Sequence, residues 1–211
     1  LQILTQAPDL RERIAQGGAI GYSIIALGIA GLLLALYRLG LLTLVGRSIS
    51  KQLADMDNPR DNNPVGRIML AARADEASDA ETLELRLGEA VLKEAPRINA
   101  WVSLLKIIAA VAPLMGLLGT VTGMIITFQA ITLFGAGDPR LMAGGISQAL
   151  ITTVLGLSVA IPMLLLHNLV HMRARSLIEI IQHEAVGLVA AKAEAVNTGG
   201  DTLGEPTGMA A

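Results

Sequence analysis

Apolar residues gather in three long runs along the chain, and polar segments separate them. The runs predict transmembrane helices at residues 17–45, 101–134 and 142–170, because roughly 20 apolar residues in a helix cross a bilayer. Within the second run, the stretch from Ile107 to Ile131 contains no Asp, Glu, Lys or Arg. The pattern therefore predicts an all-α membrane protein with three transmembrane helices.

The longest polar segment, residues 46–100, is charged and rich in alanine. Apolar residues at helical spacing predict three short helices in this segment, which we expect to be a domain in water. These helices are placed at Ser48–Met56, Val65–Ala74 and Asp79–Leu92. Ser78 and Glu81 have the spacing of a capping box at the start of the last helix. Pro96 is expected to end that helix or to kink it before the second span.

The other polar pieces are short. We expect an amphipathic segment at residues 1–16, a tight turn at 135–141, a helix at 171–195 and a disordered tail at 196–211. Arg38, near the end of the first run, is expected to extend to the lipid headgroups.

The distribution of basic residues predicts the orientation in the membrane, because cytoplasmic flanks carry an excess of Lys and Arg. Flanking residues on one side are Arg47, Lys51, Lys93, Arg97, Arg173 and Arg175, and on the other Arg11, Arg13 and Arg140. The domain at 46–100 and the C-terminus are therefore expected in the cytoplasm. The N-terminal segment and the turn at 135–141 are expected in the periplasm.

Composition agrees with a membrane protein and excludes other classes. Hydrophobic residues make up 53% of the chain and charged residues 16%, and the mean hydropathy is +0.58. A net charge of −2 with 2% aromatic residues gives no basis for nucleic-acid binding. The chain has no cysteine, so disulfides and thiolate metal sites are excluded. No set of nucleophile, base and metal ligands supports an enzyme, and no cofactor is expected.

Small and hydroxyl-bearing residues recur on one face of the second span. They are Ala112, Gly116, Thr120, Gly123 and Thr127, at spacings of three and four. Gly119 and Gly123 also form a G-x-x-x-G pair. In lipid, small residues let two helices approach closely and hydroxyls bond across the gap. Helix packing alone would explain the pair.

The third span carries a second group of polar and small residues. Gln148, Thr152 and Gly156 share one helical face, and Thr153 lies beside it. None of the three spans contains Asp or Glu, and hydroxyl or amide groups do not release protons near neutral pH. If protons cross the membrane here, the carboxylate must come from another chain.

Two ordered strings are more specific than these single features. The residues from Ala112 read APLMGLLGTV and are followed by Gly123-Met124-Ile125, and the residues from Gly144 read GGISQALITTVLGL and are followed by Ala160-Ile161-Pro162. They resemble the second and third transmembrane helices of the ExbB/TolQ/MotA proton-channel family, and most closely its ExbB branch.

The resemblance implies a fold and partners. In members of this family the second and third helices extend into the cytoplasm. The subunits assemble into an oligomeric helical bundle, a homopentamer. The pentamer surrounds the membrane helices of an ExbD-like protein, whose aspartate carries the proton. A TonB-like protein then passes the motion to outer-membrane transporters.

The resemblance also implies roles for single residues. Thr120 and Thr153 match two threonines that face the partner's aspartate, while Gln148 stands where closer relatives of the best-known ExbB carry glutamate. The residues assigned to the proton path are Thr120, Thr127, Gln148, Thr152 and Thr153. Those assigned to helix packing are Pro113, Gly116, Gly119, Gly123 and Gly156.

Other candidate sites are weaker. His167 and His171 lie four residues apart, but no carboxylate or cysteine accompanies them, so no metal site is expected. The stretch from Gly116 to Thr120 lacks the lysine of a phosphate-binding loop. Lys106 is expected to be an interface anchor.

The function expected is that of a subunit of a proton-driven energy-transducing complex in the inner membrane of a Gram-negative bacterium, powering uptake of iron complexes or vitamins. Two alternatives stay open. One is a TolQ-like envelope role or a MotA-like flagellar stator, and the other is a purely structural membrane scaffold.

Overall fold

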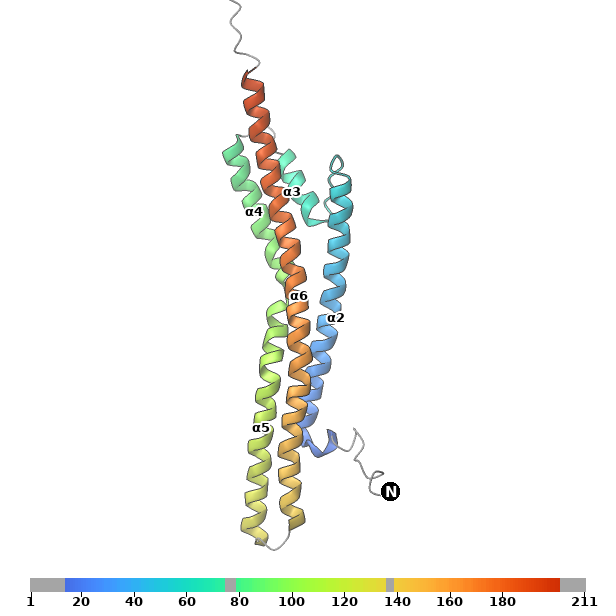
Figure 1. The fold of residues 1–211 in the computed structure, drawn as a ribbon, viewed down its shortest axis with the longest axis vertical. Coiled ribbons are helices and arrows are strands. Elements are labelled where there is room, and N and C mark those ends of the chain that lie inside the picture. The colour runs from blue at the N-terminus through green and yellow to red at the C-terminus, as the bar shows by residue number, and fades with distance from the viewer. Residues whose placement is uncertain (1–13, 75–78, 136–138, 202–211) are drawn as a thin grey trace, which may run out of the picture. The chain divides into compact units, whose positions relative to one another are not determined.

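The chain is helical in a computed structural model that describes residues 14–74, 79–135 and 139–201. The helices, labelled as in Figure 1, are α2 (Gly18–Ala54), α3 (Pro64–Arg73), α4 (Ala80–Asn99), α5 (Val102–Phe134) and α6 (Pro139–Asp201). The described residues contain no strand, and three stretches are long and apolar enough to cross a membrane, in α2, in α4–α5 and in α6. The predicted all-α class with three transmembrane helices is therefore confirmed.

The helices form two compact units, which we describe separately. The membrane unit contains residues 1–39 and 101–171, and the polar unit contains residues 40–100 and 172–211. Helices α2 and α6 contribute to both units.

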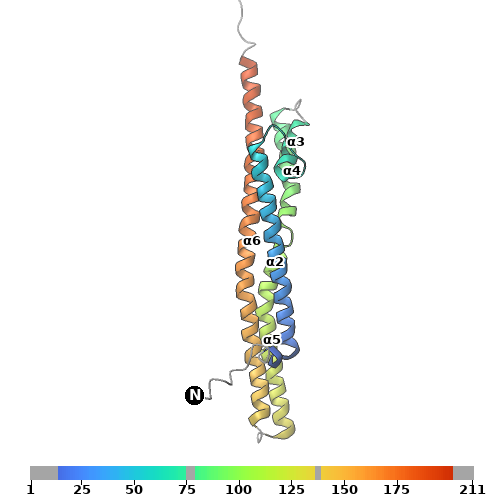
Figure 2. The same ribbon diagram turned by 90° about the vertical axis from the view of Figure 1, so that its right-hand side faces the viewer.

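In the membrane unit, α2 and α6 run in the same direction and α5 runs in the opposite direction (Figures 1 and 2). Large apolar side chains cover the outside of these helices. Leu33, Leu117 and Leu165 are each exposed to 60% or more. Such a surface is what helices in lipid present, because lipid tails are as apolar as leucine.

In the polar unit, α3 and α4 pack together through Val65, Ile68, Leu83 and Leu87, all of which are buried. Helix α3 begins at Pro64, whose missing N–H costs nothing in the first turn. The side chain of the preceding residue, Asn63, accepts a hydrogen bond from the Gly66 amide at 2.7 Å and caps the helix.

A buried ion pair links α3 to α4. Arg67 of α3 donates two hydrogen bonds to Glu94 of α4, at 3.0 and 2.6 Å, and Arg97 donates a third at 2.9 Å. Glu94 is 5% exposed. The hydrogen bonds that Arg67 donates to the Glu94 carboxylate raise the pKa of the Arg67 guanidinium, which therefore stays charged at any physiological pH.

Several boundaries differ from those predicted. The helix expected at Ser48–Met56 is the end of α2, which continues unbroken to Ala54. Helix α6 also runs past residue 195, to Asp201. Ser78, residues 1–13 and residues 202–211 lie outside the described residues, so the capping box, most of the amphipathic segment and most of the tail are untested. The residue before α4 is Asp79, whose side chain makes no capping hydrogen bond.

The break before the second span comes after Pro96. Pro96 lies inside α4, where its ring leaves the carbonyl of Leu92 without a helical donor. Leu92 is exposed, so water can bind that carbonyl. The helix ends instead at Asn99, and Trp101 adopts a left-handed conformation with φ 64° before α5 begins at Val102.

Candidate functional site

Backbone contact between α5 and α6 organises the membrane unit. A Cβ atom on Gly123 would lie 2.7 Å from the carbonyl oxygen of Gly145, and one on Gly156 would lie 2.8 Å from the carbonyl oxygen of Ala112. Carbon atoms do not approach backbone so closely. Only glycine fits at both positions, because α5 and α6 touch along their main chains there.

Two threonines fill the remaining space between these helices. The side chain of Thr152 occupies the place where a Cβ on Gly119 would be, and the hydroxyl of Thr127 occupies the place beside Gly145. Both threonines are buried, at 0% and 4% exposure. Thr152 donates to the carbonyl oxygen of Ala149 at 2.9 Å and Thr127 to that of Gly123 at 3.0 Å. Their hydroxyls are therefore satisfied by their own helices.

We call this contact the small-residue seam. It consists of Ala112, Gly116, Gly119, Gly123 and Thr127 on α5 and Gly145, Ala149, Thr152 and Gly156 on α6, all of them buried.

Helix α2 covers one side of the seam. A Cβ on Gly28 would lie 2.8 Å from Cγ2 of Val159, and one on Gly31 would lie 2.7 Å from Cε of Met163 and 3.1 Å from Cγ2 of Ile108. Gly31 therefore touches α6 and α5 together. The side on which Ile108 and Val159 lie is filled by α2.

Thr120 and Thr153 lie on the opposite side of the seam. With 3.6 residues per turn, Thr120 lies about 60° around α5 from the middle of the seam and Ile108 about 60° around in the other direction. Thr153 and Val159 are separated in the same way on α6. Because the two helices are antiparallel, both threonines face away from α2 on one common surface of the α5–α6 pair.

The two threonines are also near each other along the helix axes. A Cβ on Gly116, one turn before Thr120, would lie 3.3 Å from Cα of Thr153. Both side chains are half-buried. The hydroxyl of Thr120 donates to the carbonyl oxygen of Leu117 at 2.6 Å, and that of Thr153 to Ala149 at 3.3 Å. Each hydroxyl oxygen keeps its lone pairs available for a further donor.

Gln148 lies on the α2 side and not with Thr153. A Cβ on Gly18 would lie 2.8 Å from Nε2 of Gln148, and Gly18 has a φ of 59°. The amide group is thus placed against the start of α2.

Pro113 lies half-buried inside α5, on the same flank as Thr120. Its ring removes one N–H from the helix, which leaves the carbonyl of Ala109 without its usual donor. Lys106 lies further along this flank, about two turns before Pro113, and is exposed. The flank thus combines a hydroxyl, a helix irregularity and a cation, but no acid.

The three apolar runs supply no carboxylate to this surface. None of the residues in the three apolar runs is Asp or Glu. No group of three or more His, Cys, Asp or Glu that could hold a metal ion occurs among the residues the structure describes. The surface with Thr120 and Thr153 can therefore bind and orient a polar group through its two hydroxyls.

Comparison with known proteins identifies the family. A family model described as the MotA/TolQ/ExbB proton channel family matches residues 60–183. The chain belongs to this family. The match contains the whole small-residue seam and both threonines of the common surface, so the geometry above is that of a MotA/TolQ/ExbB family domain.

Individual family members have similar sequences. An ExbB-like biopolymer transport protein of Synechocystis sp. is 33% identical over 175 residues, which cover 75% of this chain and 69% of that protein. An ExbB homologue of Methanothermobacter thermautotrophicus is 32% identical over 172 residues, which cover 74% and 61%. The biopolymer transport protein ExbB of Xanthomonas campestris is 36% identical over 91 residues, which cover 43% and 36%. The matched part thus spans about a third to two thirds of these relatives.

One charged residue of the membrane unit is more buried than the sequence indicated. Arg38 is only 6% exposed, so it lies against neighbouring helices, while its expected reach to the lipid headgroups stays a prediction. It falls seven residues after Gly31, two helical turns along the face by which α2 contacts α5 and α6. This spacing was the signal in the sequence that could have indicated an inward position.

Proposed function

We propose that this family member is a subunit of a membrane complex in which proton entry drives movement, and that Thr120 and Thr153 form the surface along which the proton passes. The observation that supports the proposal is their placement together, on the side of the α5–α6 pair that α2 leaves open. Membership of a proton channel family and the lack of an acid in the three runs support a partner that brings the carboxylate.

The proposed partner is an ExbD-like single-span protein whose helix, with an intramembrane aspartate, lies against this surface. Protonation of the aspartate removes its charge, so the protonated and ionised forms favour different positions of the partner helix. The energy available is about 2.3 kcal/mol for each charge that crosses 100 mV. Five copies of the chain would surround the partner, and a TonB-like protein would transmit the movement across a Gram-negative envelope.

The other polar residues assigned to the path have supporting roles in this proposal. Thr127 and Thr152 lie in the small-residue seam with satisfied hydroxyls, and Gln148 lies beside Gly18. We propose that they fix the helices around the path, and that the proton contacts only Thr120 and Thr153.

The partner is tested by native mass spectrometry of the complex, extracted gently from its own membranes through a tag on the C-terminal residues. Five copies with a small single-span protein that carries an intramembrane aspartate are expected. A ring without such a partner in several mild detergents would favour a structural scaffold.

The path is tested by proton flux in vesicles that contain the intact complex. Thr120→Val and Thr153→Val keep side-chain shape and remove the hydroxyl, so each is expected to lower flux at least about tenfold, because a hydrogen bond to a charged group is worth about 1.5–3 kcal/mol. Thr132→Val is the matched control, because Thr132 also bonds to its own helix, at 2.8 Å from the carbonyl oxygen of Phe128, but faces away from the seam. Equal flux in all three variants, with the oligomer intact, would exclude the proposed path.

The family model covers the MotA and TolQ branches as well, so the biological output is a separate question. Loss of the gene is expected to abolish uptake of iron chelates in the ExbB-like case. Leakage of the envelope or loss of swimming, with uptake unchanged, would assign the chain to the TolQ-like or MotA-like alternative.

A further inference from the structure

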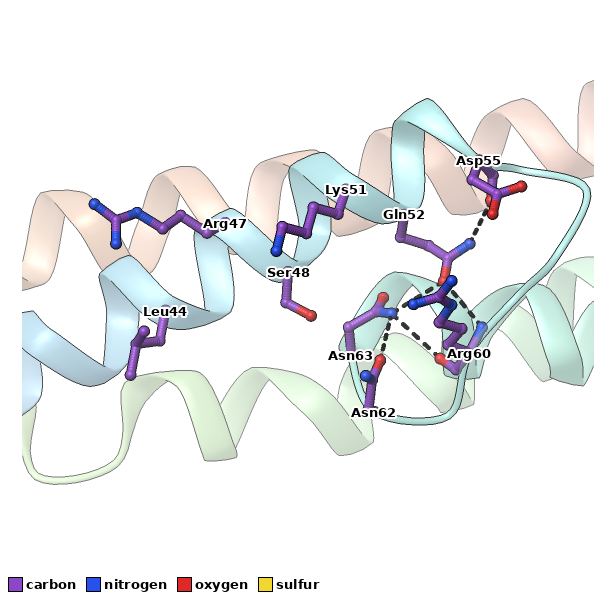
Figure 3. A pocket seen from close by; sticks show the side chains of 9 residues that line it. All are labelled: Leu44, Arg47, Ser48, Lys51, Gln52, Asp55, Arg60, Asn62 and Asn63. Atoms are coloured by element: carbon purple, nitrogen blue, oxygen red, sulfur yellow. Dashed lines mark hydrogen bonds between the residues drawn. The ribbon is translucent and has the colours of Figure 1, made fainter.

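A polar hollow of about 520 Å³ lies in the polar unit, where the loop after α2 folds back on the end of that helix (Figure 3). Gln52 holds the loop in place. Its Oε1 accepts hydrogen bonds from the Arg60 amide at 2.9 Å and from Nδ2 of Asn63 at 3.1 Å, and its Nε2 donates to the carbonyl oxygen of Asp55 at 2.7 Å. Gln52 and Asn63 are 3% and 2% exposed. These two buried amides at the base of the hollow are therefore held rigidly by hydrogen bonds.

Three basic side chains line this hollow: Arg47, Lys51 and Arg60. Some other basic groups of the polar unit pair with carboxylates, as Arg67 does with Glu94 and Arg175 with Glu179. No ion pair joins the three lining cations to a carboxylate in the part of the chain that the structure describes. Their charges are therefore available to a ligand.

The acidic group on the hollow does not balance these charges. Asp55 also lines it, but its Oδ1 accepts a hydrogen bond from Nδ2 of Asn58 at 3.1 Å. Figure 3 shows Asp55 at the end of the helix, beyond Gln52, while Lys51 ends beside the hydroxyl-bearing Ser48. Three cations against one acid leave a net charge of +2 around the opening.

A second hollow of about 610 Å³ adjoins the first and shares Arg47 and Lys51 with it. It adds a further cation, Arg173, and an apolar wall that includes Leu42 and Leu177. Arg173 has no carboxylate partner among the described residues either. The two hollows together thus offer cations and hydroxyls next to aliphatic side chains.

We propose that these hollows bind the phosphate headgroup of an anionic phospholipid, with the cations on the phosphate and the start of an acyl chain on the apolar wall. A phosphate with its negative oxygens is the ligand that clustered Arg and Lys recognise. The apolar wall favours a lipid over free phosphate, because an inorganic anion gains nothing from Leu42 and Leu177.

The position in the sequence supports a lipid as the source. Arg47 is the first charged residue after residues 39–46 of α2, and Arg173 lies three residues after the end of the third apolar run at residue 170. Both cations are therefore expected where the helices leave the hydrocarbon, which is the depth of the headgroups. Basic residues at that depth attract anionic lipids.

The proposal is tested by native mass spectrometry and by lipid titration of the intact protein in nanodiscs that contain phosphatidylglycerol or phosphatidylcholine. Wild-type protein is expected to retain phosphatidylglycerol in preference. Lys51→Gln and the double variant Lys51→Gln with Arg60→Gln should weaken this binding by about fivefold for each cation removed. The backbone amide of Arg60, which bonds to Gln52, is unchanged in these variants.

Lys93→Gln is the matched control, since Lys93 is an exposed lysine of the same unit that pairs with Glu89 instead of lining a hollow. It should bind phosphatidylglycerol as the wild type does. An equal loss of phosphatidylglycerol binding in Lys93→Gln and Lys51→Gln would overturn the proposal in favour of a general effect of surface charge. No preference for phosphatidylglycerol, or its displacement by inorganic phosphate at millimolar concentration, would overturn it as well. Circular dichroism and the oligomeric mass check that each variant is folded. None of these measurements depends on proton flux.

Discussion

Gly119→Ala is the sharpest test of the small-residue seam, because a single methyl group is expected to push two membrane helices apart. The added Cβ would overlap Oγ1 and Cβ of Thr152 and would lie 2.8 Å from its Cγ2. Thr152 is fully buried and its hydroxyl is bound to the carbonyl oxygen of Ala149. It has no free space into which it could turn.

The size of the effect follows from this overlap. Forcing an extra methyl group into a packed interior costs about 1–3 kcal/mol, and the overlap with three atoms of one immobile side chain favours the upper half of that range. For a protein of this size, about 2 kcal/mol corresponds to a fall in Tm of about 4–8 °C. The assay is thermal unfolding of the purified protein in a mild detergent, with the oligomeric mass measured in parallel.

Two further variants make this prediction refutable. Gly144→Ala places the same methyl group on α6, where no atom lies within 4 Å, so it should leave the Tm unchanged or raise it slightly. Combining Gly119→Ala with Thr152→Gly removes the three side-chain atoms that the new methyl group would meet and should recover at least half of the loss. The seam does not have the tight packing described if Gly119→Ala and Gly144→Ala have the same Tm. The same conclusion follows if the Tm of the double variant is no higher than that of Gly119→Ala.

Further predictions concern the polar unit and the start of α5. Glu94→Gln should lower the free energy of unfolding by about 1–2 kcal/mol, because it leaves the charge of Arg67 uncompensated in a site that is about two-thirds buried; denaturant unfolding measures it. Since the pKa of Arg67 is raised by Glu94, the arginine's share of this stability is complete at and below neutral pH and is lost only at strongly alkaline pH, so the difference between Glu94→Gln and wild type should be the same at pH 7 and pH 9. Asn63→Ala should cost at least about 1 kcal/mol through loss of the cap, and faster hydrogen exchange of the Gly66 amide would report it. Trp101→Gly should be tolerated with a change below about 1 kcal/mol, because relief of the left-handed conformation offsets the added freedom of glycine; a larger loss of thermal stability would contradict this.

The features that depend on helical periodicity and on apolar length could be predicted from the sequence. Charge-free runs define the three spans, and spacing by three and four places Gly116, Gly123 and Thr127 on one face. Spacing within one helix cannot tell which neighbour each flank meets. Gln148 and Thr153 are five residues apart, which places them about 140° apart around α6, but only the contacts of Gly18 and Gly31 show which of them lies on the side of α2.

Other differences arise where tertiary structure outweighs local propensity. Pro96 is a strong local signal for a break, yet it lies inside α4, where Leu92 one turn earlier is an exposed residue, and the chain turns at Trp101 instead. The inward position of Arg38 likewise depends on the neighbouring helices.

The backbone contact between α5 and α6 restricts how such a protein can do mechanical work. Where a carbonyl of one helix is in contact with the main chain of the other, as at Gly123 with Gly145 and at Gly156 with Ala112, axial sliding would drive main-chain atoms into one another. The two helices therefore behave as a single rigid body. Any displacement coupled to proton entry has to occur at the outer faces of this α5–α6 pair, either against α2 or against whatever meets Thr120 and Thr153. Cross-linking the two helices to each other should leave such movement intact, whereas cross-linking either face should stop it.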